Sequence, residues 1–143
     1  MTSEPYTALD LAVLALHEYE SKGKLITNLD LQKILYLLWG AYYSVTHKIL
    51  FYEEFVAWKT GPAIEEVWDR YRRFIATPIL SHDPVRPHPD GLLIKGLIDY
   101  FSQMDLMEIW KMARDAPWEE SYSKGRGTVI GRNRIRRHLS EKL

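Results

Sequence analysis

Two capping boxes, each placed ahead of an apolar stripe, constrain the fold of this chain most strongly. Thr7 is followed three residues later by Asp10, and Thr27 is followed in the same way by Asp30. In such a pair the hydroxyl and the carboxylate satisfy backbone N–H groups that a helix start leaves without partners. The sequence therefore predicts two helix starts within its first 30 residues.

The apolar residues behind both boxes recur at helical spacing. The first helix is expected to end near Gly23, and the second to run to about His47. Tyr36, Trp39 and Tyr43 widen the apolar face of the second helix beyond what one neighbour needs. We therefore predict that the second helix is central.

The segment after the second predicted helix lacks helical spacing of its apolar residues. Its β-branched and aromatic residues favour extended structure, and a short edge strand is expected at Phe55 to Lys59. Gly61-Pro62 is typical of a helix start, with Pro62 at the first helical position and Glu65 and Glu66 in the first turn, where the helix dipole favours anions. The inner face of this helix is expected to hold Ile64, Val67, Trp68, Tyr71 and Phe74 or Ile75.

Four prolines between Thr77 and Gly91 exclude helix and central strand, so this segment is expected to be an ordered surface loop. Further helices are predicted at Leu92 to Phe101, Asp105 to Arg114 and about Ile130 to Leu139. The expected fold is mainly α, a compact single-domain helical bundle of about six helices with one or two short edge strands. One domain is expected over residues 1–143.

The composition limits the cellular compartments in which the protein is expected to work. The 143 residues include no cysteine, which excludes disulfides and thiolate chemistry and suits a reducing cytosol. No apolar run approaches the ~18 residues of a membrane span, and Met1 to Tyr6 lacks the features of a signal peptide. We expect a soluble, cytoplasmic protein that does not bind membranes.

Catalytic motifs are missing. The histidines show no metal-ligand spacing, and there is no nucleophile elbow, phosphate-binding loop or dinucleotide fingerprint. His82, Asp83 and His88 could in principle hold a metal ion, but a solvated loop is the expectation. We predict no enzymatic activity, no cofactor, no metal and no small-molecule substrate.

Aromatic residues cluster in the middle of the chain. Eleven of the eighteen fall between Tyr36 and Phe74. Most should fill the core, yet their density exceeds what a central helix and one neighbour can bury. Partly exposed Tyr and Trp are preferred anchors of protein interfaces, so we also expect a partner-facing aromatic patch.

The charge is unevenly spread although the formal net charge is zero. Ser121 to Ser140 contains six Lys/Arg and no Asp/Glu, which leaves the rest of the chain at about −6. Two interpretations stand: a contact surface for nucleic acid or an acidic partner, or a cationic helix whose arginine stems lie on aromatics of the body. The residues concerned are Arg126, Arg132, Arg134, Arg136 and Arg137.

Three motifs resemble those of one known family. Leu31 to Tyr36 reads LQKILY, Ala57 to Pro62 reads AWKTGP, and Pro117-Trp118 forms a proline-tryptophan pair. In this order and spacing they resemble the Panacea-domain (SocA-like, phage-associated) antitoxins, over roughly Leu9 to Leu139. Many members carry Thr-His shortly before the proline-tryptophan pair, where this chain has Met112-Ala113-Arg114, so any site built on that histidine is missing here.

The resemblance implies an antitoxin that binds its cognate toxin and blocks it. One member acts as an adaptor that hands its toxin to a Clp-type protease, which adds such a protease as a second partner. The alternative function is a small nucleic-acid-binding regulator that uses the arginine-rich end. The residues expected to bind the partner are Gln32, Lys33, Tyr36, Trp58, Lys59, Gly61, Pro62 and Trp118.

Overall fold

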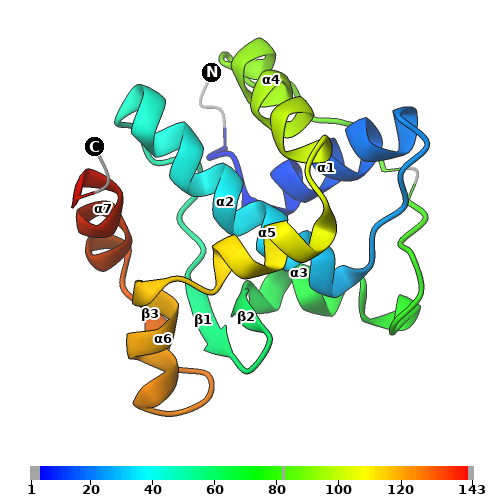
Figure 1. Cartoon of the computed structure of the whole chain (residues 1–143). Helices are drawn as coiled ribbons and strands as arrows, with labels where there is room; N and C mark the ends of the chain where they lie inside the picture. The colour runs from blue at the N-terminus through cyan, green and yellow to red at the C-terminus, as the bar shows by residue number, and fades with distance from the viewer. Residues whose placement is uncertain (1–3, 82, 142–143) are drawn as a thin grey trace.

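The computed structural model describes residues 4–81 and 83–141. The mainly α prediction is confirmed, and the described residues form seven α-helices, a 3-10 turn and three short strands (Figure 1). In chain order these are α1 (Ala8–Ser21), α2 (Asn28–Thr46), β1 (Phe55–Trp58), β2 (Gly61–Ala63), α3 (Glu65–Arg70), η1 (Arg72–Phe74), α4 (Gly91–Ser102), α5 (Leu106–Ala113), α6 (Ala116–Ser123), β3 (Val129–Ile130) and α7 (Arg132–Glu141).

Both capping boxes form as predicted. The Thr7 hydroxyl accepts a hydrogen bond from the Asp10 N–H at 3.0 Å, and the Thr27 hydroxyl accepts one from the Asp30 N–H at 3.2 Å. In both boxes the aspartate also accepts from the threonine N–H. Helix α2 ends at Thr46, where His47 takes a left-handed conformation with φ of 58°. The second predicted helix is thus confirmed in both bounds.

Helix α2 lies at the centre of the molecule, as its wide apolar face indicated. It contacts α1, α4, α5, α7 and strand β2, and Figure 1 shows it running between them. Its inner residues, including Leu31, Ile34, Leu35 and Leu38, are at most 1 % exposed. Every other element is therefore positioned, directly or through one neighbour, by α2.

The sheet has the strand order β2-β1-β3, and both pairings are antiparallel. The prediction of an edge strand at Phe55 to Lys59 is wrong in one respect: β1 is the central strand. Phe55 pairs with Ile130 and Val56 with Val129, so the C-terminal part of the chain covers the second edge of β1. Sequence patterns cannot show a pairing between residues so far apart.

The prediction that Gly61-Pro62 starts a helix is also wrong. Gly61 has φ of +132°, which no helix accepts, and Gly61–Ala63 forms the return strand of a hairpin with β1. Pro62 is tolerated there because β2 lies at the edge of the sheet, where a missing N–H costs little. The helix begins at Glu65, with Glu65 and Glu66 in its first turn as predicted.

Two further helix bounds differ from expectation. Helix α3 ends at Arg70, so Phe74 lies half-buried in η1 and Ile75, with φ of 55°, is exposed rather than part of an inner face. Ile130 belongs to β3, and the last helix starts two residues later than predicted, at Arg132. In the first case the 3-10 turn η1 interrupts an apolar series that looks continuous in sequence, and in the second case Ile130 pairs with Phe55 of β1.

The proline-rich segment is a surface loop, as predicted, in its described residues. It is tied to the body by the Ile79 N–H, which donates to the Ile26 carbonyl at 2.9 Å, and by Arg86, which pairs with Asp10 at 2.8 Å. Within residues 4–81 and 83–141, no helix combines the length and the apolar character that crossing a membrane requires.

Candidate functional site

Gln32, the first polar residue of the LQKILY motif, lies inside the protein. Its side-chain NH₂ donates to the Asn28 side-chain carbonyl at 3.0 Å, and its own carbonyl accepts from the Ile64 N–H at 2.7 Å. Asn28 in turn donates to the Trp68 carbonyl at 3.0 Å. Gln32 therefore satisfies the Ile64 N–H between β2 and α3, and it supports the site from within.

Lys33 lies next to Gln32 and is also fully buried. Its Nζ donates to the Thr60 hydroxyl at 3.1 Å and lies 5.0 Å from the centroid of the Trp110 ring. Burial lowers the pKa of Lys33 to about 7, although the nearby Asp30 carboxylate opposes the change. A lysine from the first motif is thus bonded to a threonine from the second, directly beneath α5.

Gly61 makes this packing possible. A Cβ atom at this position would lie 2.9 Å from Lys33 Cε and 3.3 Å from Arg114 Cγ. The φ of +132° also favours glycine over any other residue. The AWKTGP motif therefore supplies a residue without a side chain where a lysine and an arginine pass the backbone.

Tyr36 connects the first motif to the start of α6. Its hydroxyl is within 3.0 and 2.9 Å of the two Asp115 carboxylate oxygens, and burial together with this carboxylate raises the Tyr36 pKa. Asp115 also accepts from the Trp118 N–H at 3.1 Å and so caps α6. Tyr36 is 4 % exposed, and through Asp115 it links α2 to the start of α6.

Trp118 is held in place by three contacts. Its indole N–H donates to the Trp58 carbonyl at 2.7 Å, its ring stacks on Tyr122 at 5.4 Å, and the Arg114 guanidinium lies 5.0 Å from its ring centroid. Trp58 itself is half-buried and packs edge-to-face on Trp68 at 5.3 Å. The proline-tryptophan pair is therefore joined to the strand of the AWKTGP motif.

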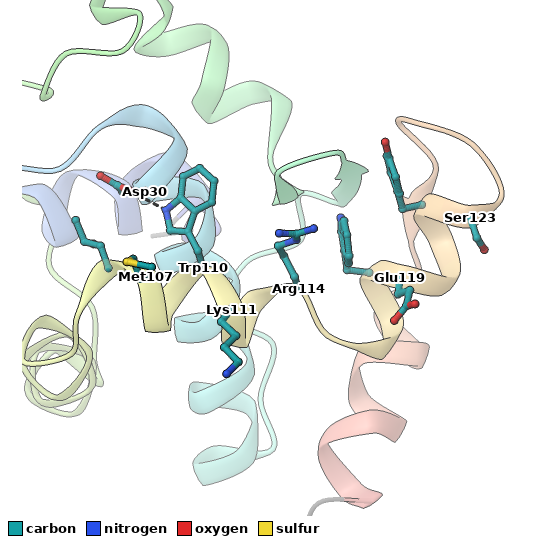
Figure 2. Close-up of a pocket in the computed structure, with 10 residues that line it drawn as sticks. Asp30, Met107, Trp110, Lys111, Arg114, Glu119 and Ser123 are labelled. Atoms are coloured by element: carbon teal, nitrogen blue, oxygen red, sulfur yellow. Dashed lines mark hydrogen bonds between the residues drawn. The ribbon is translucent and has the colours of Figure 1, made fainter.

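Above these buried contacts lies an open groove of about 990 Å³ between α5, α6 and the start of α2. Figure 2 shows Trp110 and Arg114 extending to the same side of α5, with Asp30 beside Trp110. The Trp110 indole N–H donates to Asp30 at 2.8 Å. The residues that line the groove are Asp30, Leu106, Met107, Trp110, Lys111, Arg114, Trp118, Glu119, Tyr122 and Ser123.

Apolar and aromatic side chains line the groove together with charged residues of both signs, the cations Lys111 and Arg114 and the carboxylates Asp30 and Glu119. Arg114 is exposed and makes no salt bridge to a carboxylate of the described residues, and Lys111 points to the other side of α5 in Figure 2. Glu119 lies on the α6 side of the groove. Such a surface suits non-covalent binding of an apolar segment.

The histidines and carboxylates that the structure describes form no group able to hold a metal ion. His82 lies outside the described residues. His88 packs edge-to-face against Tyr6 and Tyr42, and its Nδ1 accepts from the Asp90 N–H at 2.9 Å. Burial lowers the His88 pKa, so this histidine is a packing residue of the loop.

Three of the five tail arginines are engaged by the body of the protein. Arg134 forms a two-pronged ion pair with Glu120, Arg132 donates to the Tyr52 carbonyl at 3.0 Å, and the Arg136 guanidinium lies 4.9 Å from the Tyr43 ring centroid. Arg126 and Arg137 are exposed. The structure thus favours the interpretation in which arginine stems lie on aromatics.

The eight residues expected to bind a partner do come together in space, but in two layers. Gln32, Lys33, Tyr36, Gly61 and Pro62 are buried, and Trp118 is 7 % exposed. Trp58 is half-buried and Lys59 is exposed. The motif residues mainly build the support, and whether any of the eight touches a partner stays a prediction.

Sequence reasoning missed the residues that line the groove itself, chiefly Trp110, Arg114 and Tyr122. A signal was present: together with Trp118 they recur every four residues, which aligns side chains on one side of a helical segment. The signal was obscured because Asp115 ends one helix and caps the next, so no continuous helix carries the series.

The fold and this site define a mainly helical domain whose two sequence motifs are packed beneath an aromatic groove. Residues 31–86 match a family model described as "Antitoxin SocA-like, Panacea domain". The match confirms the resemblance to the Panacea-domain family over about two fifths of the chain, from α2 to the proline-rich loop, and marks an antitoxin-like domain. No curated protein and no solved structure matches the chain significantly.

Proposed function

We propose that this protein is an antitoxin that neutralises a cognate toxin by direct binding, through the groove between α5 and α6, without covalent chemistry. The observation that carries this proposal is the arrangement of the matched segment. Its motif residues Lys33, Thr60 and Gly61 lie beneath Trp110 and Arg114, and Tyr36 positions α6 through Asp115. A match to an antitoxin family and a groove supported by that family's motifs therefore favour the same surface.

The physical demands of neutralisation agree with this surface. Keeping a toxin inactive requires a dissociation constant near nanomolar, which corresponds to a binding free energy of about 12 kcal/mol. Interfaces of that strength depend on a few aromatic or arginine anchors set in a rigid surface. Trp110 and Trp118 each have their indole N–H bonded within the protein, so both rings are held in fixed positions before a partner arrives.

The test is growth rescue with the product of the adjacent reading frame. Cells that express that product alone should stop growing, and co-expression of this protein should restore growth. Arg114→Glu should reduce protection at least tenfold in plating efficiency, since it places an anion in the groove. Lys95→Glu, the same charge reversal at an exposed position on α4, should protect fully.

Failure of the unaltered protein to protect would overturn the proposal. Equal protection by Arg114→Glu and Lys95→Glu would exclude the groove as the binding surface. The half-life of the toxin in the same cells tests the adaptor role. If this protein shortens that half-life only when a Clp-type protease is present, the toxin is degraded. An unchanged half-life supports blocking alone.

A small nucleic-acid-binding regulator is the second candidate, favoured by the run of six Lys/Arg without acids in Ser121 to Ser140. Arg132, Arg134 and Arg136 are engaged elsewhere, which leaves Lys124, Arg126 and Arg137 to meet a phosphate backbone. The salt dependence described in the Discussion separates the two candidates.

A further inference from the structure

Arg114 is a positioned cation that pairs with no carboxylate of the residues that the structure describes. Its stem passes Gly61, with Cγ 3.3 Å from where a Cβ would stand, and its guanidinium lies 5.0 Å from the Trp118 ring centroid. Within residues 4–81 and 83–141 no carboxylate forms a salt bridge with it, and its guanidinium donates no hydrogen bond to a described residue. A guanidinium held in this way is ready to bind a carboxylate with two parallel hydrogen bonds.

The tryptophans beside Arg114 offer only their ring surfaces. The Trp110 indole N–H is bonded to Asp30 at 2.8 Å and the Trp118 indole N–H to the Trp58 carbonyl at 2.7 Å. Neither ring therefore has a donor left to recognise a polar group. The Trp118 ring is only 7 % exposed and is covered by Tyr122 and Arg114, so the half-buried rings of Trp110 and Tyr122 remain to contact a large apolar or aromatic side chain and bury its surface.

Glu119 limits how much negative charge the groove accepts. It lies on the α6 side of the same groove, opposite the α5 side that carries Arg114. A polyanion such as a nucleic-acid backbone would bring phosphates against this carboxylate, whereas a single carboxylate can bind Arg114 alone. The distribution of charge thus favours a peptide with one acidic residue over a nucleic acid.

We propose that the groove binds a short segment of the partner protein in which an aromatic or large aliphatic side chain lies within two residues of a single carboxylate, with Arg114 as the carboxylate anchor. This inference rests on the proposed function for the identity of the partner. The apolar side chain lies against Trp110 and Tyr122, and the carboxylate accepts hydrogen bonds from the Arg114 guanidinium.

The test uses a phage-displayed library of random twelve-residue peptides, selected against the full chain. The expected consensus is Asp or Glu within two positions of Trp, Phe or Leu. The best peptide is then synthesised with a twin in which the acid becomes its amide. Fluorescence anisotropy should show at least tenfold weaker binding for the twin, and an equal loss when the original peptide meets Arg114→Gln.

The matched control is Arg73→Gln. Arg73 also lies over an aromatic ring, 4.9 Å from the Phe74 centroid, but outside the groove, so its replacement should leave peptide binding unchanged. Thermal unfolding of Arg114→Gln checks that the variant is folded, and the amide twin keeps the test valid if it is not. No enriched consensus, a consensus without an acid, or equal binding of peptide and twin would overturn the inference.

The outcomes also separate this inference from the proposed function. If Arg114→Gln loses the peptide but still protects cells, the groove is not the surface that binds the toxin, and the antitoxin role stands on another surface. If the unaltered chain selects the expected peptides but protects no cells, the groove chemistry stands and the antitoxin role fails.

Discussion

Lys33 places an amine in the interior of the protein, where a positive charge is poorly solvated. Its side chain is fully buried, with Thr60 as its hydrogen-bond partner and the Trp110 ring beside it. Burial moves its pKa from 10.5 down to about 7. Between these two values the folded protein holds fewer protons at Lys33 than the unfolded chain does, so folding is linked to pH.

This linkage predicts that the free energy of unfolding rises with pH between 7.5 and 9. In that range the unfolded chain keeps the proton that folded Lys33 releases, so each pH unit adds about 1 kcal/mol. Urea unfolding at three pH values measures the slope. Lys33→Met should abolish it, while Lys95→Met, at an exposed position, should retain it. The same slope in both variants would show that Lys33 keeps its ordinary pKa.

The sequence singled out Gln32, Lys33 and Tyr36 correctly as unusual residues but assigned them to the surface. Polar residues within an apolar helix are compatible with either a contact surface or a buried network. Their partners Ile64, Thr60 and Asp115 lie between 27 and 79 residues away. Only a fold that brings those partners together can decide between the two interpretations.

At the level of elements, the hairpin of β1 and β2 is the part that local patterns described least well. Gly-Pro followed by two glutamates is typical of a helix start, and the helix does begin at Glu65. Strand β2 is only three residues long, too short to show the alternation by which strands are recognised. Capping boxes, in contrast, depend on residues three apart, and both were predicted correctly.

Gly61→Ala should destabilise the protein by about 2 kcal/mol. The new Cβ would lie 2.9 Å from Lys33 Cε, and alanine tolerates the φ of +132° poorly. Thermal and urea unfolding measure the loss. Gly96→Ala is the matched control, because nothing lies within 4 Å of its added Cβ inside α4, and it should stabilise the helix by up to about 1 kcal/mol. If the Gly61→Ala protein is as stable as the original, the Lys33 and Arg114 side chains move away from the new Cβ without a cost in free energy.

On the scale of the whole molecule, the basic C-terminal segment makes many of its contacts with the rest of the same protein. The basic helix α7 packs against α2 and α6, where Arg134 meets Glu120 and Arg136 covers Tyr43. Hydrogen bonding to Arg134 lowers the Glu120 pKa. Composition predicted the asymmetry, but the direction in which the arginines point depends on how α7 packs against distant elements.

Binding to generic duplex DNA should therefore be weak and only shallowly dependent on salt. With Lys124, Arg126 and Arg137 as the remaining exposed cations of the tail, the slope of log Kobs against log salt should be about −3 or shallower. Anisotropy with a labelled duplex of random sequence measures it, and the Arg126→Ala, Arg137→Ala double variant should lose the residual binding. A slope near −5 would instead favour the nucleic-acid regulator.

The central position of β1 affects how the protein is made. Its partner on one side follows within a few residues, but Val129–Ile130 leaves the ribosome more than 70 residues later. At ordinary elongation rates of ~5–20 residues per second, one edge of β1 stays uncovered for roughly 4–15 s in each nascent chain. During that interval the hairpin is open to mispairing with neighbouring chains, so the yield of active protein should depend on translation speed and on chaperones that shield exposed strands.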